Sequence, residues 1–279
     1  MPSSDANDFE EPIRILSDLH LGHPGSKVTD IAQIRPLLEG AKTVIFNGDT
    51  YELRKQSLLA ITDKFRADLE ALIDELGIRA VFLTGNHDPE FSDTHYLDLA
   101  GGKIFITHGD LLYDDVSPWS KLIDSLHEQR TIVRETYPEN YLDDLDLRLK
   151  ASKQIAARTN IRKAKGKPGL SGRINALLAE LWPPKRPLRI LKTWATAHHL
   201  AHDLRDQFRP DADIIIIGHT HRAVVHERSG KRVINTGAYL PVSGTYVVEI
   251  DANRLRIIRA KQQRNRDYAL LNEVASLDW

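Results

Sequence analysis

The stretch VFLTGNHDPE (residues 81–90) begins with apolar and β-branched residues and ends in an amide, an imidazole and a carboxylate. Its apolar half has the composition of a strand that is buried on both faces of a sheet. Polar residues after a glycine also make ordinary turns, so this stretch alone does not identify a site. A functional site would be better supported if the same order of residues recurred elsewhere in the chain.

Four further stretches repeat this composition: IRILSDLHLGH (13–23), KTVIFNGDT (42–50), GKIFITHGD (102–110) and DADIIIIGHTH (211–221). Residues 57–76 carry apolar side chains at helical spacing, which predicts strand–helix–strand connections between the second and third strands. Later in the chain we expect further strands in KRVINTGAYL (231–240) and GTYVVEIDANRLRIIRA (244–260), the latter as a hairpin around DAN. The sequence therefore predicts an α/β fold with a second, more antiparallel sheet.

Each of the five expected strands ends in side chains that bind metals, namely Asp18 and His20, Asp49, Asn86 and His87, His108, and His219 and His221. The carboxyl ends of strands in α/β sheets are where ligands bind, so we expect these groups to converge on one edge. A strictly extended chain would place the two members of each closely spaced pair on one face. Oxygen and imidazole donors without sulfur favour manganese, iron or zinc, and we expect glycines to provide sharp turns at positions 48, 85, 109 and 218.

Composition places the chain among soluble proteins with a large core, because 41% of its 279 residues are apolar and 28% are charged. It has no cysteine, which excludes disulfides, thiolate metal sites and a cysteine nucleophile. The polar start MPSSDANDFEEP lacks the apolar segment of a secretory signal, and no stretch approaches the roughly 18 apolar residues of a membrane span. We therefore expect a soluble, cytoplasmic protein.

The ordered series DLH, GD, GNHD, HGD and GHTH resembles the calcineurin-like metallophosphoesterases, a superfamily of two-metal phosphatases and phosphodiesterases. The resemblance implies a four-layer αββα sandwich of two mixed sheets, with a core at residues 12–111 and 211–260. It also implies that Asp18, His20 and His221 hold one metal, that Asn86, His108 and His219 hold the other, and that Asp49 bridges both.

The resemblance further implies a reaction in which a metal-bridging hydroxide attacks the phosphorus of a phosphoester or pyrophosphate, with two divalent ions as cofactors. Mn²⁺ is the first expectation, with iron or zinc as alternatives. His87 is expected to assist the leaving oxygen as an acid or a hydrogen-bond donor. The family pattern GDxxD reads GDTYE here, so Glu52 is the candidate for orienting His87.

His108 and His219 are 111 positions apart, far more than an ordinary connection, so a helical cap insertion is expected at residues 112–210. Helices are predicted in residues 117–133, 140–165, 171–182 and 188–208. HGDLLYDD, GDTYE and this insertion resemble the UDP-2,3-diacylglucosamine pyrophosphatases most, although those enzymes carry arginine in place of His87 and have a shorter insertion. We therefore expect a general phosphodiesterase or phosphomonoesterase first, the lipid pyrophosphatase second, and a non-catalytic binding scaffold third.

Residues 148–192 contain thirteen Lys or Arg and one acidic residue, Glu180, in a chain whose net charge is −1. Apolar residues are interleaved with these charges, which suits a phosphorylated small-molecule or lipid-linked substrate. The same composition suits docking to an anionic membrane surface, in which case the protein would be peripheral to the membrane. Single-stranded nucleic acid is the rival ligand, and a solvated basic face is the simplest alternative.

Several other side chains have two interpretations each. His23 is either a substrate contact or a loop residue, and Arg222 either contacts a phosphate or is merely exposed. His198 and His202 are four apart and could grip a metal, but a partly exposed helix is favoured because the sequence offers no third ligand. We expect local or solvent partners for three other histidines, His95, His127 and His226.

Overall fold

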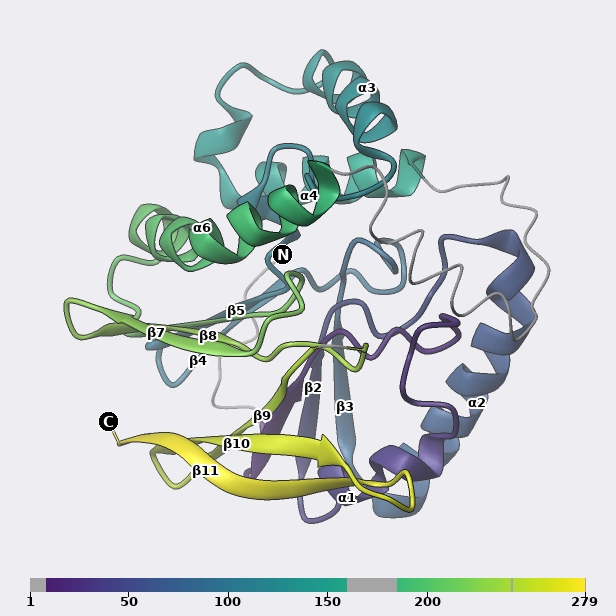
Figure 1. Ribbon diagram of the computed structural model, residues 1–279. Helices are drawn as coiled ribbons and strands as arrows, with labels where there is room; N and C mark the ends of the chain where they lie inside the picture. Colours follow the sequence, from purple (N-terminus) through teal and green to yellow (C-terminus); the bar gives the residue numbers. More distant parts are fainter. Residues whose placement is uncertain (1–8, 160–184, 242, 279) are drawn as a thin grey trace.

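Two β-sheets packed face to face form the centre of the computed structural model, which describes residues 9–159, 185–241 and 243–278. The strand orders are β11-β10-β9-β1-β2-β3 and β4-β5-β6-β8-β7. Helices cover the outer faces, with α2 beside the first sheet and α6 over the second (Figure 1). The predicted αββα sandwich of two mixed sheets is confirmed.

In the first sheet, the three strands from the start of the sequence are parallel, and the three strands from its end are antiparallel. Its parallel strands are β1 (Ile13–Leu16), β2 (Thr43–Asn47) and β3 (Arg79–Leu83). Its antiparallel strands are β9 (Thr245–Asp251), β10 (Arg254–Gln262) and β11 (Tyr268–Asp278). The hairpin around DAN is present, with Ala252 and Asn253 in left-handed conformations. These late strands join β1 instead of making a sheet of their own, because β9 pairs with the edge of β1 that β2 leaves open.

The second sheet has three parallel strands at its centre and one antiparallel strand at each edge. The central strands are β5 (Ile104–Thr107), β6 (Ile214–Ile217) and β8 (Lys231–Asn235). The edge strands, β4 (Tyr96–Leu99) and β7 (Val224–Arg228), have mixed burial and carry no clear apolar run, so the sequence did not reveal them. All five strands predicted to carry ligands are present, three in the first sheet and two in the second.

Apolar side chains fill the space between the sheets, where Ile15, Ile45 and Ile216 are fully buried. The outer face of the first sheet is covered by η2 (Ile31–Ile34), α1 (Arg35–Leu38), η3 (Gln56–Leu58) and α2 (Leu59–Leu76). Burial of each large aliphatic side chain contributes about 1.5–3 kcal/mol, so the two sheets are held as one rigid support.

The regular elements described between β5 and β6 are all helices, joined by turns and loops: η4 (Asp110–Leu112), α3 (Ile123–Arg134), η5 (Tyr141–Asp143), α4 (Leu145–Arg158) and α6 (Lys185–Phe208). Leu149 of α4 and Leu204 of α6 pack on the second sheet as its outer layer. A separate apolar cluster joins Val116, Val133 and Ile155 above that layer. The helix predicted at residues 171–182 lies outside the described residues. None of the helices in the described ranges is long and apolar enough to cross a membrane.

Candidate metal centre

The predicted ligands lie in five loops that follow β1, β2, β3, β5 and β6. Backbone hydrogen bonds join these loops in pairs: Asp18 N donates to Gly48 O at 3.1 Å, and Gly218 N donates to His108 O at 2.9 Å. The two sheets are joined by the Asn47 amide, which donates to Thr107 O at 3.0 Å. The loops therefore form one block at the carboxyl ends of both sheets.

Three sets of side chains among the described residues bring potential ligand atoms within 4.8 Å of one another: Asp18, His20, Asp49 and His221; Asp49, His108 and His219; and His20, Glu52 and His87. We call Asp18, His20 and His221 the first ligand group. The second ligand group comprises His108 and His219 together with Asn86. Asp49 is the member that the first two sets share.

Asp49 lies between the two ligand groups. Its Oδ1 accepts a hydrogen bond from the His87 backbone N–H at 2.7 Å. Its Oδ2 lies 3.8 Å from His20 Nε2 and 3.4 Å from His108 Nε2, so one oxygen faces both ligand groups. Burial alone would raise the pKa of Asp49, but His108 and His87 hold it well below its usual range. The buried carboxylate is therefore charged and aimed at the centre.

The donor atoms fit a pair of divalent cations. In the part of the chain that the structure describes, Asp49 Oδ2, Asn86 Oδ1 and His108 Nε2 are buried without a hydrogen-bond partner. An unsatisfied buried polar group costs about 1–3 kcal/mol, and cations at this position would satisfy all three atoms. His108 Nδ1 donates to Asn47 O at 2.9 Å, and this contact aims Nε2 at Asp49. Burial lowers the pKa of His108, but Asp49 raises it overall to about 10.

Five of the predicted ligands have left-handed backbone conformations, with φ between 49° and 66°: Asp18, His20, Asp49, His219 and His221. Such conformations cost about 1–3 kcal/mol each and persist only where the surroundings enforce them. The condition of a strictly extended chain through the two closely spaced pairs is therefore not met. The chain turns sharply as each strand ends, and the turn points side chains from two sheets at one place.

The four glycines divide into two kinds. Gly48 and Gly109 have positive φ and turn the chain as expected. Gly85 and Gly218 have ordinary φ, so the expected turning role is wrong for them. They are needed for space, since a Cβ at these positions would overlap the carboxylates of Asp49 and Asp18, respectively.

His87 lies beside the centre, with its ring centroid 4.6 Å from that of His20. Its Nδ1 is 2.8 Å from Glu52 Oε2, so the structure brings together the two residues that the sequence paired. Burial raises the pKa of Glu52, but His87 lowers it overall to about 2. The Arg54 guanidinium donates to His87 Nε2 at 3.1 Å, a contact the sequence did not reveal. Because arginine only donates, the ring carries its proton on Nδ1 and donates it to Glu52.

Asp88 is a second residue that sequence reasoning missed. Its fully buried carboxylate accepts backbone hydrogen bonds from Asp49 and Gly85 through Oδ1, and from Thr50 and Tyr51 through Oδ2, at 2.7–3.1 Å. Burial and the charge of Asp49 raise the pKa of Asp88 to about 6. Asp88 thus fixes the loop after β3 against the loop after β2. Its place directly after GNH was the available signal.

The remaining residues singled out from the sequence lie at varied distances from the centre. His23 Nε2 is 4.0 Å from Glu52 Oε2, so His23 is at the edge of the site. Arg222 is exposed and lies over the Trp194 ring of α6, 5.7 Å from its centroid. His95 Nδ1 contacts Thr84 Oγ1 at 2.7 Å, and His127 is exposed next to Asp115.

The helical pair His198 and His202 does have a third histidine nearby. His226 of β7 lies with its Nδ1 3.2 Å from His202 Nε2, and the rings of His198 and His226 are 4.0 Å apart. However, Arg205 donates to His202 Nδ1 at 3.2 Å, which requires the proton of a neutral His202 ring to be on Nε2. Burial and Arg228 also lower the pKa of His202 to about 4. This arrangement is a satisfied hydrogen-bond chain and leaves His202 no free lone pair for a metal.

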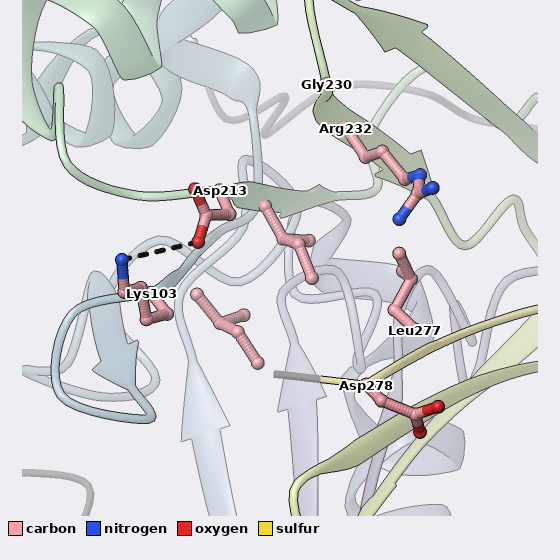
Figure 2. Close-up of a pocket in the computed structure, with 8 residues that line it drawn as sticks. Lys103, Asp213, Gly230, Arg232, Leu277 and Asp278 are labelled. Carbon is pink, nitrogen blue, oxygen red and sulfur yellow. Dashed lines mark ion pairs between the residues drawn. The ribbon is translucent and has the colours of Figure 1, made fainter.

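A hollow of about 180 Å³ lies at the opposite ends of β5 and β6 (Figure 2). Lys103 and Asp213 form an ion pair of 3.5 Å at its rim, and Arg232 and Asp278 line it as well. Its volume is below the roughly 300 Å³ at which ligand pockets begin, and all the predicted ligands are at the other ends of these strands. The hollow is therefore separate from the metal centre.

Known proteins resemble this chain in structure and in sequence. Vps29 with bound Zn²⁺ from Entamoeba histolytica is similar in structure, with TM-score 0.40, 15% identity and coverage of 95% of this chain and 98% of that one. A dimetal phosphatase from Danio rerio gives TM-score 0.45 and 9% identity, covering 97% and 99%. No curated protein matches the chain. The profile of the family Calcineurin-like phosphoesterase matches residues 11–223, so this protein belongs to the calcineurin-like phosphoesterase family.

Proposed function

We propose that the protein is a two-metal phosphohydrolase that cleaves a phosphoester or pyrophosphate bond. The observation that carries the proposal is the position of Asp49, whose unpartnered Oδ2 faces His20 on one side and His108 on the other. Burying a carboxylate oxygen without a hydrogen-bond partner is costly, and divalent cations beside Asp49 Oδ2 would offset that cost.

In this proposal the first ligand group and Asp49 hold one divalent cation, and the second ligand group and Asp49 hold the other. When bound, two such ions lower the pKa of water and neutralise charge on the phosphoryl oxygens. The left-handed ligand loops and the carboxylate of Asp88 keep the donors in place before any substrate arrives. Oxygen and imidazole donors favour Mn²⁺, with iron or zinc as alternatives.

His87, Glu52 and Arg54 supply the groups that act on the leaving oxygen. With Arg54 in place, His87 holds its proton at Nδ1 against Glu52, and the donor beside Nε2 is the guanidinium. A substrate oxygen at this position would accept a hydrogen bond from the Arg54 guanidinium. If it displaces Arg54, it would instead meet a His87 ring protonated at Nε2. Because Nδ1 already donates its proton to Glu52, a proton at Nε2 is present only in the doubly protonated ring.

The test is hydrolysis of bis(p-nitrophenyl) phosphate and p-nitrophenyl phosphate by metal-free protein, with and without added Mn²⁺. We expect no turnover after chelation and recovery on addition of Mn²⁺, Fe²⁺ or Zn²⁺. Asp213→Ala, which alters an exposed ion pair at the far end of the sheet, is the control and should behave as the wild type. Protein that binds metals yet hydrolyses neither ester, nor a nucleotide-sugar pyrophosphate, would instead be a non-catalytic scaffold.

For the substrate we propose a small phosphorylated molecule with an apolar part, of which a UDP-2,3-diacylglucosamine-type lipid pyrophosphate is one candidate. The supporting observation is on α6, where Leu188 and Leu191 are 67% and 57% exposed beside the basic residues Arg189 and Lys192. The same surface would suit peripheral contact with an anionic cytoplasmic membrane. Most of the basic segment, residues 160–184, lies outside the described residues.

Co-sedimentation with phosphatidylglycerol vesicles, compared with gel shifts on oligonucleotides at about 150 mM salt, separates these ligands, because nonspecific nucleic-acid binding weakens steeply with salt. We expect binding to the vesicles that Leu188→Ser/Leu191→Ser weakens. Binding to oligonucleotides alone would favour a nucleic-acid ligand, and binding to neither would leave a solvated basic face.

A further inference from the structure

Lys153 of α4 is a buried cation that the proposed chemistry does not use. The residue is only 5% exposed, and its Nζ lies 2.8 Å from both carboxylate oxygens of Asp110. The third contact of Nζ is Thr84 O at 2.9 Å. Asp110 is fully buried and also accepts a hydrogen bond from Ser152 Oγ at 3.1 Å. All three donors of the ammonium group are thus engaged inside the protein.

The two residues that Lys153 contacts are neighbours of the second ligand group. Asp110 follows His108 by two positions in HGD, and Thr84 precedes Asn86 by two positions in TGN. One ammonium group therefore joins the loop after β5 to the loop after β3. It is supplied by the insertion and not by either sheet.

The insertion also orients the third member of the group. His219 Nε2 donates to Val116 O at 2.8 Å, an arrangement that leaves Nδ1 for a cation. The ring of Trp119 lies with its centroid 4.9 Å from that of His219. By contrast, Asp18 and His20 are fixed by backbone hydrogen bonds to Gly48 O and Asp49 O, both from the core.

We infer that Lys153 is a positioning residue of the second metal site, through which the insertion sets the separation of His108 and Asn86. This inference rests on the proposed two-metal function. The ammonium group also pairs with both carboxylate oxygens of Asp110, which lies two positions beyond His108. Contacts of this kind behind metal ligands typically change metal affinity by 10–100-fold.

The test uses Lys153→Met/Asp110→Asn, which removes both charges. The single change Lys153→Met would leave the buried carboxylate of Asp110 unpaired and risks unfolding. The matched control is Arg14→Met/Glu249→Gln, because Arg14 and Glu249 form another buried ion pair, at 2.8 Å, between β1 and β9. Apo protein is titrated with Mn²⁺ by calorimetry, bound metal is counted by mass spectrometry after dialysis, and Tm is measured for each variant.

We expect the Lys153→Met/Asp110→Asn protein to keep one Mn²⁺ per chain at wild-type affinity and to bind the second about 10–100-fold more weakly. The control should bind both ions as the wild type does, even if its Tm falls. Unchanged binding of both ions by the first variant, or an equal loss in the control, would overturn the inference. Wild-type protein that binds two ions but hydrolyses no ester would refute the proposed function and leave this inference standing, whereas fewer than two bound ions would refute both.

Discussion

The two ligand groups share Asp49 and differ in how the insertion contacts them. Asp18 N donates to Gly48 O and Tyr239 N donates to Asp18 O, both at 3.1 Å, so Asp18 of the first group is fixed by backbone hydrogen bonds within the core. In the second group, Asn47 O of the core holds His108, while the chain between β5 and β6 adds the ammonium group of Lys153 behind the ligand loops and Val116 O beside His219. The insertion also reaches the loop of the first group, where Trp194 Nε1 donates to Thr220 O at 2.9 Å, but its buried ion pair lies at the second group.

The largest effect should come from the residue common to both groups. Asp49→Ala removes the oxygen that lies 3.8 Å from His20 Nε2 and 3.4 Å from His108 Nε2, so both metal sites should fail together. Loss of several kcal/mol of transition-state stabilisation corresponds to a fall of roughly 10³-fold in kcat/KM. Metal analysis and aryl phosphate hydrolysis measure this. Retention of both ions by the variant would exclude the bridging position of Asp49.

A second experiment separates the two groups. His221→Ala and His219→Ala should each lose one of two bound ions and most of the activity. Only His219→Ala also removes the hydrogen bond to Val116 O, whose net contribution is about 0.5–1.5 kcal/mol. Hydrogen exchange around Val116 should therefore speed up several-fold in that variant alone. Equal hydrogen-exchange rates around Val116 in both variants would show that the hydrogen bond from His219 does not stabilise the insertion.

His87→Ala tests the chemistry without disturbing either group. The variant should keep both ions but lose turnover by roughly 10²-fold on esters with poor leaving groups, and less on activated aryl esters. Glu52→Gln should show a weaker form of the same pattern, because it loses only the charge beside Nδ1. If both types of ester slowed equally, His87 would have no part in leaving-group departure.

The smallest expected effect is on stability. Asp88→Asn replaces a carboxylate oxygen that accepts backbone hydrogen bonds with an amide that donates, which leaves buried N–H groups unpaired at a cost of about 1–3 kcal/mol. Denaturant unfolding of the apo protein measures this. The loss should exceed that of Asp98→Asn, whose partner Arg209 is partly exposed. A smaller loss than in that control would mean that Asp88 does not fix the loops.

The strands that carry ligands could be predicted from sequence because a buried strand is a short apolar run and the ligands follow it directly. IIII before GHTH and VIFN before GD are examples. The hairpin at Ala252 and Asn253 followed from local turn chemistry in the same way. Strands β4 and β7 could not be found, since their partly exposed residues lack a clear period.

The sequence predicted only those site residues that closely follow a strand. Asp18, Asp49 and His108 each follow a strand, whereas Lys153 lies 43 positions beyond Asp110, in a helix where lysine is ordinary. Arg54 is missed for a similar reason, because it meets His87 only when two loops fold together. The left-handed turns also escaped prediction, since Asp and His rarely adopt them unless tertiary contacts enforce them.

We expect two cations on either side of one Asp49 oxygen. Anomalous diffraction from crystals of the wild-type protein soaked in Mn²⁺ tests this arrangement directly. Two peaks about 3.5–4 Å apart are expected, one among Asp18, His20 and His221 and the other among Asn86, His108 and His219. A single peak, or two peaks that do not share Asp49, would contradict it.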